Sequence, residues 1–268
     1  MPTVLDGIIS GVREDLGRRR AALPLAELEG RLATVGPALD PMPGIRSAEG
    51  VAVIAEVKRS SPSKGALAEI PEPGRLARSY AAGGASAVSV LTEERRFAGS
   101  LADLDEVRAS VRIPLLRKDF MVDPYQVVEA RAHGADLVLL MASALDDTLL
   151  RDLHDQATDL GMTPLVEVHD AEELERALAL GAALVGVNAR NLKTLEVDPQ
   201  VVARILPQLP GDVVSVAESG VAGPSDVVDY VRSGARAVLV GEALVTGGAP
   251  SDAVRRFIEA ARDASHEE

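Results

Sequence analysis

The 268-residue sequence contains no cysteine, which excludes a disulfide framework and thiolate chemistry and fits a reducing compartment. Its net charge of −13 argues against nucleic acid or an anionic membrane as the main partner. Residues 1–16 lack the basic segment of a signal peptide. No apolar run approaches the roughly 20 residues that a membrane helix needs. We therefore expect a cytoplasmic protein with neither a nucleic-acid nor a membrane partner.

Lysine is also scarce. Of 28 basic residues only four are lysine, namely Lys58, Lys64, Lys118 and Lys193. A genomic preference for arginine codons explains the imbalance. Under such a preference, a lysine should persist where its ability to release a proton is needed, because arginine stays charged near neutral pH. These four positions are therefore candidate functional positions.

Four segments of the sequence share one pattern, a Gly-Ala pair followed by an apolar run rich in β-forming residues. They lie at 83–91, 133–141, 180–188 and 233–241. The glycine is typical of the end of a helix, and the run is typical of a strand buried on both faces. Their spacing of about 50 residues is twice that of one βα unit, which predicts a further strand between neighbours.

The predicted intermediate strands are present at 113–119, 163–169 and 212–220, and VAVIAEVK at 51–58 precedes the series. Amphipathic helical segments separate the strands. Eight strands that alternate with helices predict an α/β protein with a (β/α)₈ TIM barrel and right-handed crossovers. A doubly wound open sheet is the main competing fold.

The chain outside the barrel is short. Residues 1–48 carry an apolar helical stripe and form a predicted N-terminal helical extension that packs on the barrel, too small for an independent domain. The predicted barrel spans residues 49–262. Residues 263–268 form a predicted frayed tail.

Charged side chains follow the predicted strands, and the active site of such a barrel lies at those C-terminal ends. Glu56 and Lys58 share one face of the first strand with Ile54. The ends of the later strands carry Lys118, Glu167, Asn188, Arg190, Glu218 and Ser219. The simpler interpretations are an ion pair that closes the barrel for Glu56 and Lys58, a solvated pair for Lys118 and Asp119, and loop charges for Lys64 and Lys193.

No group of side chains has metal-ligand spacing, so we expect neither a metal nor a cofactor. His169 follows a strand near the site, and we favour a structural role for it. The glycines of AESGV (217–221) and LVGEAL (239–244) allow backbone N–H groups to approach an anion. Because these loops follow the last two strands, they predict a sugar-phosphate ligand.

Seven segments, EVKRSSPSKG, LTEERRFAGS, LRKDFMVDPYQ, LVEVHD, GVNARNL, AESGV and LVGEAL, together resemble the indole-3-glycerol phosphate synthase family of tryptophan biosynthesis. The resemblance covers essentially the whole chain. LMASALDD and the end of LVGEALVT are less typical, and we interpret both as packing variation. The resemblance implies a carboxy-lyase that closes the indole ring of 1-(2-carboxyphenylamino)-1-deoxy-D-ribulose 5-phosphate and releases carbon dioxide and water.

The resemblance also implies roles for individual residues. Lys118 is the general acid of the condensation, Glu167 lies by the anilino nitrogen, and Glu56 and Lys58 assist dehydration. Asn188 and Ser219 complete the catalytic set. The substrate-binding residues are Ser61, Pro62, Phe97, Phe120, Arg190, Leu192 and Glu218. The phosphate-binding residues are Lys58, Ser61, Gly220, Gly241 and, through its backbone, Glu242.

Two other functions fit such a barrel, a Schiff-base sugar-phosphate aldolase and a non-catalytic phosphate-binding barrel. The combination of Glu56, Lys58, Lys118 and Glu167 argues against the second, because a binding protein needs no paired acids and bases. A lysine acid works best when its pKa is lowered toward neutrality, and we expect this of Lys118. The expected partner is a small anionic sugar phosphate, and a monomer is our working expectation.

Overall fold

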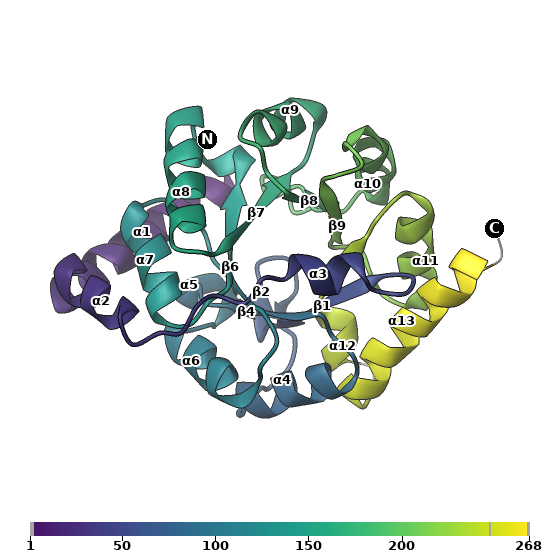
Figure 1. Cartoon of the computed structure of the whole chain (residues 1–268), viewed down its shortest axis with the longest axis horizontal. Coiled ribbons are helices and arrows are strands. Elements are labelled where there is room, and N and C mark those ends of the chain that lie inside the picture. The colour runs from purple at the N-terminus through teal and green to yellow at the C-terminus, as the bar shows by residue number, and fades with distance from the viewer. Residues whose placement is uncertain (1–2, 247, 267–268) are drawn as a thin grey trace.

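Eight apolar segments pair in parallel and close into a barrel in the computed structural model, which describes residues 3–246 and 248–266 (Figure 1). The closed order is β1-β10-β9-β8-β7-β6-β5-β4. The strands are β1 (Ala52–Val57), β4 (Ala87–Leu91), β5 (Leu115–Lys118), β6 (Leu137–Met141), β7 (Thr163–Val168), β8 (Leu184–Asn188), β9 (Val214–Glu218) and β10 (Ala237–Val240). The predicted (β/α)₈ barrel is confirmed, and closure between β1 and β10 excludes the open sheet.

A ring of helices surrounds the strands (Figure 1). Its members are α4 (Pro73–Ala82), α6 (Leu101–Ser110), α7 (Pro124–Ala132), α8 (Asp147–Asp159), α9 (Ala171–Ala179), α10 (Pro199–Ile205), α11 (Pro224–Arg232) and α13 (Pro250–His266). Asp123 and Asp170 cap α7 and α9 by accepting hydrogen bonds from backbone N–H groups. Gly84 and Gly134 follow helices in the left-handed conformation, which explains two of the Gly-Ala pairs.

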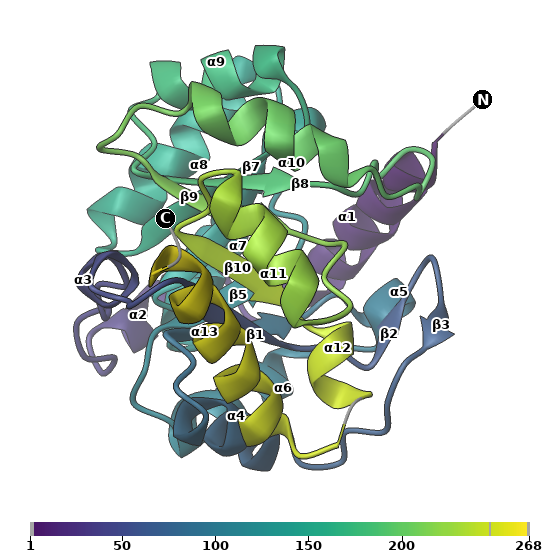
Figure 2. The ribbon, with the colours of Figure 1, turned by 90° about the vertical axis from the view of Figure 1, so that its right-hand side faces the viewer.

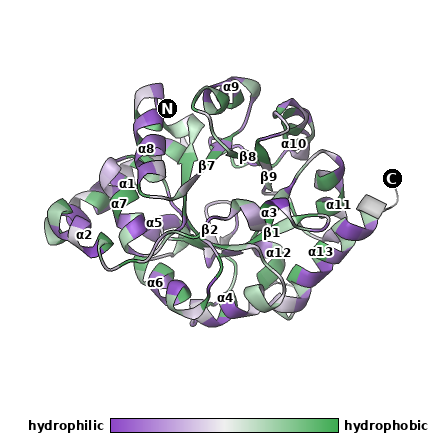
Figure 3. Ribbon diagram, viewed as in Figure 1, coloured by the Kyte–Doolittle hydropathy of each residue, from purple (hydrophilic) through white to green (hydrophobic). Residues whose placement is uncertain are grey.

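Burial explains the apolar runs. Almost every strand residue is buried, because side chains of a barrel strand face either the interior or the surrounding helices. Figure 3 shows hydrophobic residues on the central strands and hydrophilic residues on the outer helices. Short elements lie between the long ones, namely β2 (Ser60–Ser61), β3 (Gly65–Ala66), α5 (Glu94–Phe97), α12 (Glu242–Val245) and the 3₁₀ turns η1 (Ala142–Ala144) and η2 (Leu206–Gln208).

Three helices precede the barrel, α1 (Val4–Ala22), α2 (Leu25–Leu32) and α3 (Met42–Arg46). In Figure 2, the start of α1 lies at the same end of the barrel as the β2–β3 hairpin, and α3 lies at the opposite end. The stripe of α1 joins the main core through Leu5, Ile8 and Val12. At the other end of the chain, α13 continues to His266, so the predicted tail at 263–268 is helical over its first four residues. Residues 267–268 lie outside the described residues.

Helix α1 is fixed to a loop of the barrel by Arg95 of α5. Its Nε lies 2.9 Å from Asp15 Oδ2, and its Nη2 lies 2.9 Å from Glu14 Oε2. Asp15 is 7% exposed, and the hydrogen bond from Arg95 holds the pKa of its carboxyl below the usual range. A Cβ on Gly11 would lie 3.1 Å from Arg95 Cδ, so the guanidinium side chain runs close along the helix. The extension is thus bound to the barrel by charge as well as by apolar packing.

A buried ion network links α1, α7 and β5. Arg117 is fully buried, and its guanidinium lies 2.9 Å from both Asp119 Oδ2 and Glu129 Oε2. It also donates to Thr92 Oγ1 and to the carbonyl oxygen of Gln126. Glu129 Oε1 accepts a hydrogen bond of 2.9 Å from Arg19 of α1. The network satisfies charges that would otherwise be costly to bury.

We predict that Arg117→Met destabilises the protein by about 3–5 kcal/mol, because it leaves the buried carboxylate of Asp119 without a cation and that of Glu129 with Arg19 alone. Urea unfolding followed by circular dichroism measures the loss.

The matched control is Arg255→Met, which removes an exposed pair with Asp252 on α13 and should change stability little. Equal stability of the two variants would contradict this account of the network.

Candidate active site at the mouth of the barrel

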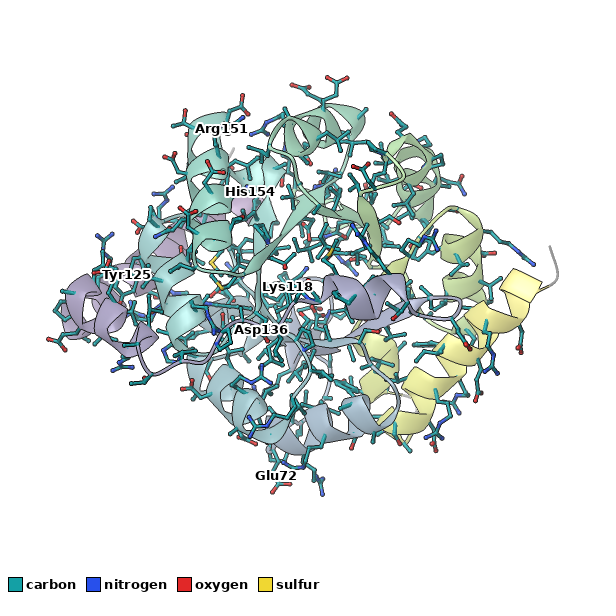
Figure 4. The ribbon with its side chains drawn as sticks, in the orientation of Figure 1. Glu72, Lys118, Tyr125, Asp136, Arg151 and His154 are labelled. Carbon is teal, nitrogen blue, oxygen red and sulfur yellow. The ribbon has the colours of Figure 1, made fainter. Side chains whose placement is uncertain are left out.

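A cavity of about 1040 Å³ opens at the C-terminal ends of the strands. Every site residue predicted from the sequence lines it, namely Glu56, Lys58, Ser61, Pro62, Phe97, Lys118, Phe120, Glu167, Asn188, Arg190, Leu192, Glu218, Ser219, Gly220, Gly241 and Glu242. Figure 4 places Lys118 near the centre of the ring, whereas Glu72 and Arg151 point outward from it.

Lys118 and two carboxylates form the deep centre of the cavity. The Nζ atom of Lys118 lies 2.7 Å from Glu218 Oε2 and 3.3 Å from Glu167 Oε2. Both carboxylates are only 1% exposed. The three residues come from β5, β7 and β9, which are not neighbours in the sheet. Because successive residues of a strand face opposite ways, Arg117 points outward and Lys118 points inward. Asp119 follows the strand, pairs with Arg117 and also borders the cavity.

The alternative of a solvated pair between Lys118 and Asp119 is wrong. Asp119 is 5% exposed, and it pairs with Arg117 and accepts a hydrogen bond of 2.6 Å from Thr92 Oγ1.

The electrostatics of this centre differ from our sequence-based expectation for the lysine. Burial works against the ammonium of Lys118, but the charges of Glu218, Glu167 and Glu56 outweigh burial and raise its pKa above the ordinary value. The expected lowering is therefore wrong, because the neighbours of Lys118 are carboxylates rather than cations.

The two carboxylates differ from one another. Burial raises the pKa of Glu218 to about 8, with the charge of Glu167 adding to the effect and that of Lys118 opposing it. Burial alone would raise the pKa of Glu167 as well. The charge of Lys118 and, to a smaller extent, that of His169 lower this pKa below the ordinary value. Two adjacent carboxyl groups thus differ in proton affinity, with Glu167 the stronger acid and Glu218 the weaker one.

Glu56 and Lys58 form a second pair in the same cavity. Lys58 Nζ lies 2.6 Å from Glu56 Oε2, and Glu56 is 3% exposed. The hydroxyl of Ser89 donates to Glu56 Oε1 at 3.4 Å. The two residues form an ion pair, as the simpler interpretation required, and both line the cavity. A Cβ on Gly241 would lie 2.7 Å from Glu56 Oε2, so only glycine lets the chain pass this close to the pair.

Asn188, Ser219 and Arg190 are linked across the ends of β8 and β9. Asn188 Oδ1 accepts hydrogen bonds from Ser219 Oγ at 2.8 Å and from the backbone N–H of Arg190 at 2.9 Å. The guanidinium of Arg190 donates to the carbonyl oxygen of Leu195 at 3.0 Å. Gly220 has a φ of +79°, and a Cβ there would lie 2.6 Å from the Tyr230 hydroxyl. The start of this loop therefore requires glycine.

An apolar wall faces the charged groups. The rings of Phe97 and Phe120 lie 6.0 Å apart between centroids and are inclined by 41°. The cavity also has lining residues that the sequence analysis did not identify, namely Ile8, Ser63, Leu91, Asp119, Leu139, Met141, Leu195, Val221, Leu239 and Val240. Leu139 and Met141 share one face of β6, so alternation along that strand could have identified them. Nothing in the sequence of α1 distinguishes Ile8 from the core residues around it.

The four lysines do not all reach the cavity. Lys58 and Lys118 line it. Lys64 Nζ lies 2.5 Å from Oε1 of Glu242, a lining residue, and its side chain is 54% exposed. Lys193 is exposed in the loop after β8. Arginine-rich composition was thus a sound guide to Lys58 and Lys118 and a weaker guide to the two loop lysines.

Two searches of the described residues were negative. Within residues 3–246 and 248–266, no group of three or more His, Cys, Asp or Glu side chains could hold a metal ion. Over the same residues, no helix has the length and apolar character needed to cross a membrane.

The raised pKa of Glu218 predicts a pH-dependent stability. Between pH 4.5 and about pH 8, Glu218 keeps its proton in the folded protein but loses it in the unfolded chain. The resulting stabilisation of the folded state is fully present below pH 4.5 and is lost as pH rises through about 8. Glutamine cannot release a proton. We therefore expect the stability of Glu218→Gln, relative to the wild type, to increase between about pH 5 and about pH 9.

Urea unfolding at both pH values measures this difference. Glu175→Gln, on an exposed position of α9, is the matched control, and its stability relative to the wild type should stay constant. A constant difference for Glu218→Gln would show that Glu218 is ionised throughout.

Comparison with known proteins places the chain in a family. A sequence model of the family described as indole-3-glycerol phosphate synthase matches residues 5–257. The chain is 65% identical over 255 residues to the indole-3-glycerol phosphate synthase of a Nocardioides species, covering 95% of this chain and 98% of that protein. It is 59% identical over 258 residues to indole-3-glycerol phosphate synthase 1 of Streptomyces coelicolor, covering 96% of each.

Solved structures with low identity support the fold alone. A thiamine phosphate pyrophosphorylase from Pyrococcus furiosus has a TM-score of 0.61 at 15% identity and covers 81% of this chain and 97% of its own. A 3-hexulose-6-phosphate synthase has a TM-score of 0.61 at 16% identity and covers 78% and 99%. On the strength of the family match and the sequence identities, this chain belongs to the indole-3-glycerol phosphate synthase family.

Proposed function

We propose that the cavity converts 1-(2-carboxyphenylamino)-1-deoxy-D-ribulose 5-phosphate to indole-3-glycerol phosphate, carbon dioxide and water, as a lyase of tryptophan biosynthesis. Family membership supports the reaction. The observation that carries the assignment of residues is the buried Lys118 between Glu167 and Glu218, in one cavity with the Glu56–Lys58 pair. The reaction needs both an acid and a base at two stages, and the cavity supplies two such sets.

Lys118 serves as the acid of the ring closure. An aromatic carbon attacks the C2′ ketone, and the ketone oxygen takes a proton as it becomes a hydroxyl. The raised pKa of Lys118 keeps it an ammonium at neutral pH, and a developing alkoxide is basic enough to take its proton. Glu218, 2.7 Å away, orients the ammonium, so its role extends beyond the substrate contact predicted from the sequence.

Glu167 serves beside the anilino nitrogen. As an ionised carboxylate in a buried position, it stabilises positive charge on that nitrogen or accepts its proton. Loss of carbon dioxide then restores the aromatic benzene ring. Phe97, Phe120 and Leu192 form the apolar surface against which that ring packs.

Glu56 and Lys58 serve in dehydration, which needs an acid for the leaving hydroxyl and a base for a carbon-bound proton. Their contact of 2.6 Å pairs a potential acid with a potential base. Asn188 and Ser219 hold substrate through the hydrogen-bonded ends of β8 and β9. Ser61, Pro62 and Arg190 complete the contacts with the substrate.

The phosphate is held where Gly220, Gly241 and the backbone of Glu242 approach the cavity, with Lys58 and Ser61 nearby. The Glu242 carboxylate would repel an anion, but it is paired with Lys64 at 2.5 Å. This pairing offsets its charge near the phosphate.

The charge on Lys118 argues against the Schiff-base alternative. A Schiff base requires a neutral amine, and the contacts of Lys118 with Glu167 and Glu218 favour the ammonium. A purely binding barrel would have no use for two carboxylates that differ in pKa at one site. The absence of cysteine fits a reducing, cytoplasmic compartment, and a monomer is our working proposal.

The decisive experiment follows indole fluorescence after addition of the carboxyphenylamino substrate to the purified protein, with a chelator and no added cofactor. We expect a rise in emission, which would also show that no metal is required. Absence of a rise from folded protein that binds the substrate would contradict the proposed reaction. Borohydride trapping with substrate would then test for a Schiff base.

We predict that Lys118→Arg keeps the fold and the positive charge but lowers turnover by about 10²–10⁴, because arginine does not release a proton near neutral pH. The same fluorescence assay measures turnover. Lys193→Arg, at an exposed loop lysine, is the matched control. Near-wild-type activity of Lys118→Arg would rule out Lys118 as the proton donor.

A further inference from the structure

Two buried polar atoms face each other beside the catalytic centre. Glu167 Oε1 and His169 Nε2 both lack a hydrogen-bond partner among the described residues, and they lie 3.7 Å apart. Glu167 lies near the end of β7, and His169 directly follows the last residue of that strand, so the two stand at i and i+2. Unpaired polar atoms in such positions are uncommon in folded proteins, because burial without a partner is costly.

The other nitrogen of His169 restricts the protonation state of the ring. Nδ1 lies 3.1 Å from Oε2 of Glu173 on α9, and the same oxygen accepts the backbone N–H of His169 at 2.8 Å. A carboxylate oxygen only accepts hydrogen bonds, so Nδ1 carries a hydrogen. In a neutral ring, Nε2 would then direct its lone pair at Glu167. In a charged ring, it directs an N–H there.

We propose that His169 is a positioning residue, an imidazolium held by Glu173 that keeps the Glu167 carboxylate ionised and oriented toward Lys118. The proposal deepens the proposed function, because it rests on the role of Glu167 in the reaction. Glu167 then has a cation on each side, with Lys118 near Oε2 and His169 near Oε1. Loss of either cation makes the carboxylate a weaker acid.

The groups around His169 favour its charged form. The charged groups that face it are Glu167 on β7, Glu173 on α9 and Glu218 on β9. Burial disfavours the imidazolium, but the hydrogen bond to Glu173 and the charges of Glu167 and Glu218 outweigh burial and raise the pKa of His169. The coupling is reciprocal, so removing the charge of Glu167 must lower the pKa of His169.

The first test is an NMR titration of the histidine ring protons in the wild type and in Glu167→Gln, which needs no substrate. We expect the pKa of His169 to fall by about one unit in the variant, because an attractive charge is lost. His169→Gln assigns the signal. His133 is the internal control, because its exposure of 15% is close to the 16% of His169 and its Nδ1 lies 2.7 Å from Asp105.

An unchanged pKa of His169 in Glu167→Gln would overturn the proposal. This outcome is independent of catalysis, so it separates failure of the proposal from failure of the proposed function.

The second test is the pH profile of kcat/KM for His169→Gln. Glutamine can donate a hydrogen bond but carries no charge. We expect the acidic limb to move up by about one pH unit, which lowers activity about tenfold on that limb and less than about threefold at alkaline pH.

His133→Asn is the matched control and should keep the wild-type profile. An equal loss at every pH would indicate a purely structural role for His169 and, like an unchanged profile, would overturn the proposal.

Discussion

Alternation of side chains along β5 is the constraint on which both the fold and the site depend. Two consecutive charged residues of the strand face different environments. Arg117 faces outward into an ion network with Asp119, α7 and α1, and Lys118 faces the cavity. A shift of one residue in register would bury Lys118 against helices and place Arg117 in the cavity. The buried network therefore fixes the register that makes the lysine available for chemistry.

The centre of the site is a balance of buried charges. Glu167 and Glu218 lie on either side of Lys118, and their pKa values move in opposite directions although both are equally buried. The difference arises from neighbours, because Lys118 and then His169 lower the pKa of Glu167, whereas the charge of Glu167 adds to burial in raising the pKa of Glu218. A low-dielectric site strengthens each of these interactions. The same arrangement that stabilises the folded centre thus gives its members distinct proton affinities.

Much of the architecture was predictable because it depends on patterns of neighbouring residues in the sequence. Repeated Gly-Ala pairs and apolar runs located all eight barrel strands, and charges at their ends located the charged residues of the cavity. Pro62, Phe97, Phe120 and Leu192 were expected there only from the family resemblance. What sequence did not predict depends on three-dimensional neighbours. The pKa of Lys118 is raised because residues 49 and 100 positions away supply carboxylates. Ile8 reaches the cavity through the packing of α1, and the apolar stripe alone does not distinguish it from Leu5 or Val12.

The ion pairs of the cavity differ in their access to water. The side chains of Lys64 and Glu242 at the rim are 54% and 35% exposed, whereas the side chains of Lys118 and Glu218 at the base are 12% and 2% exposed. Dissolved salt screens exposed charges over about 10 Å at 0.1 M and affects buried pairs much less. Dissolved salt should therefore weaken the Lys64–Glu242 pair while leaving the Lys118–Glu218 pair nearly unchanged. The rim and the base of one cavity would then respond differently to the surrounding solution.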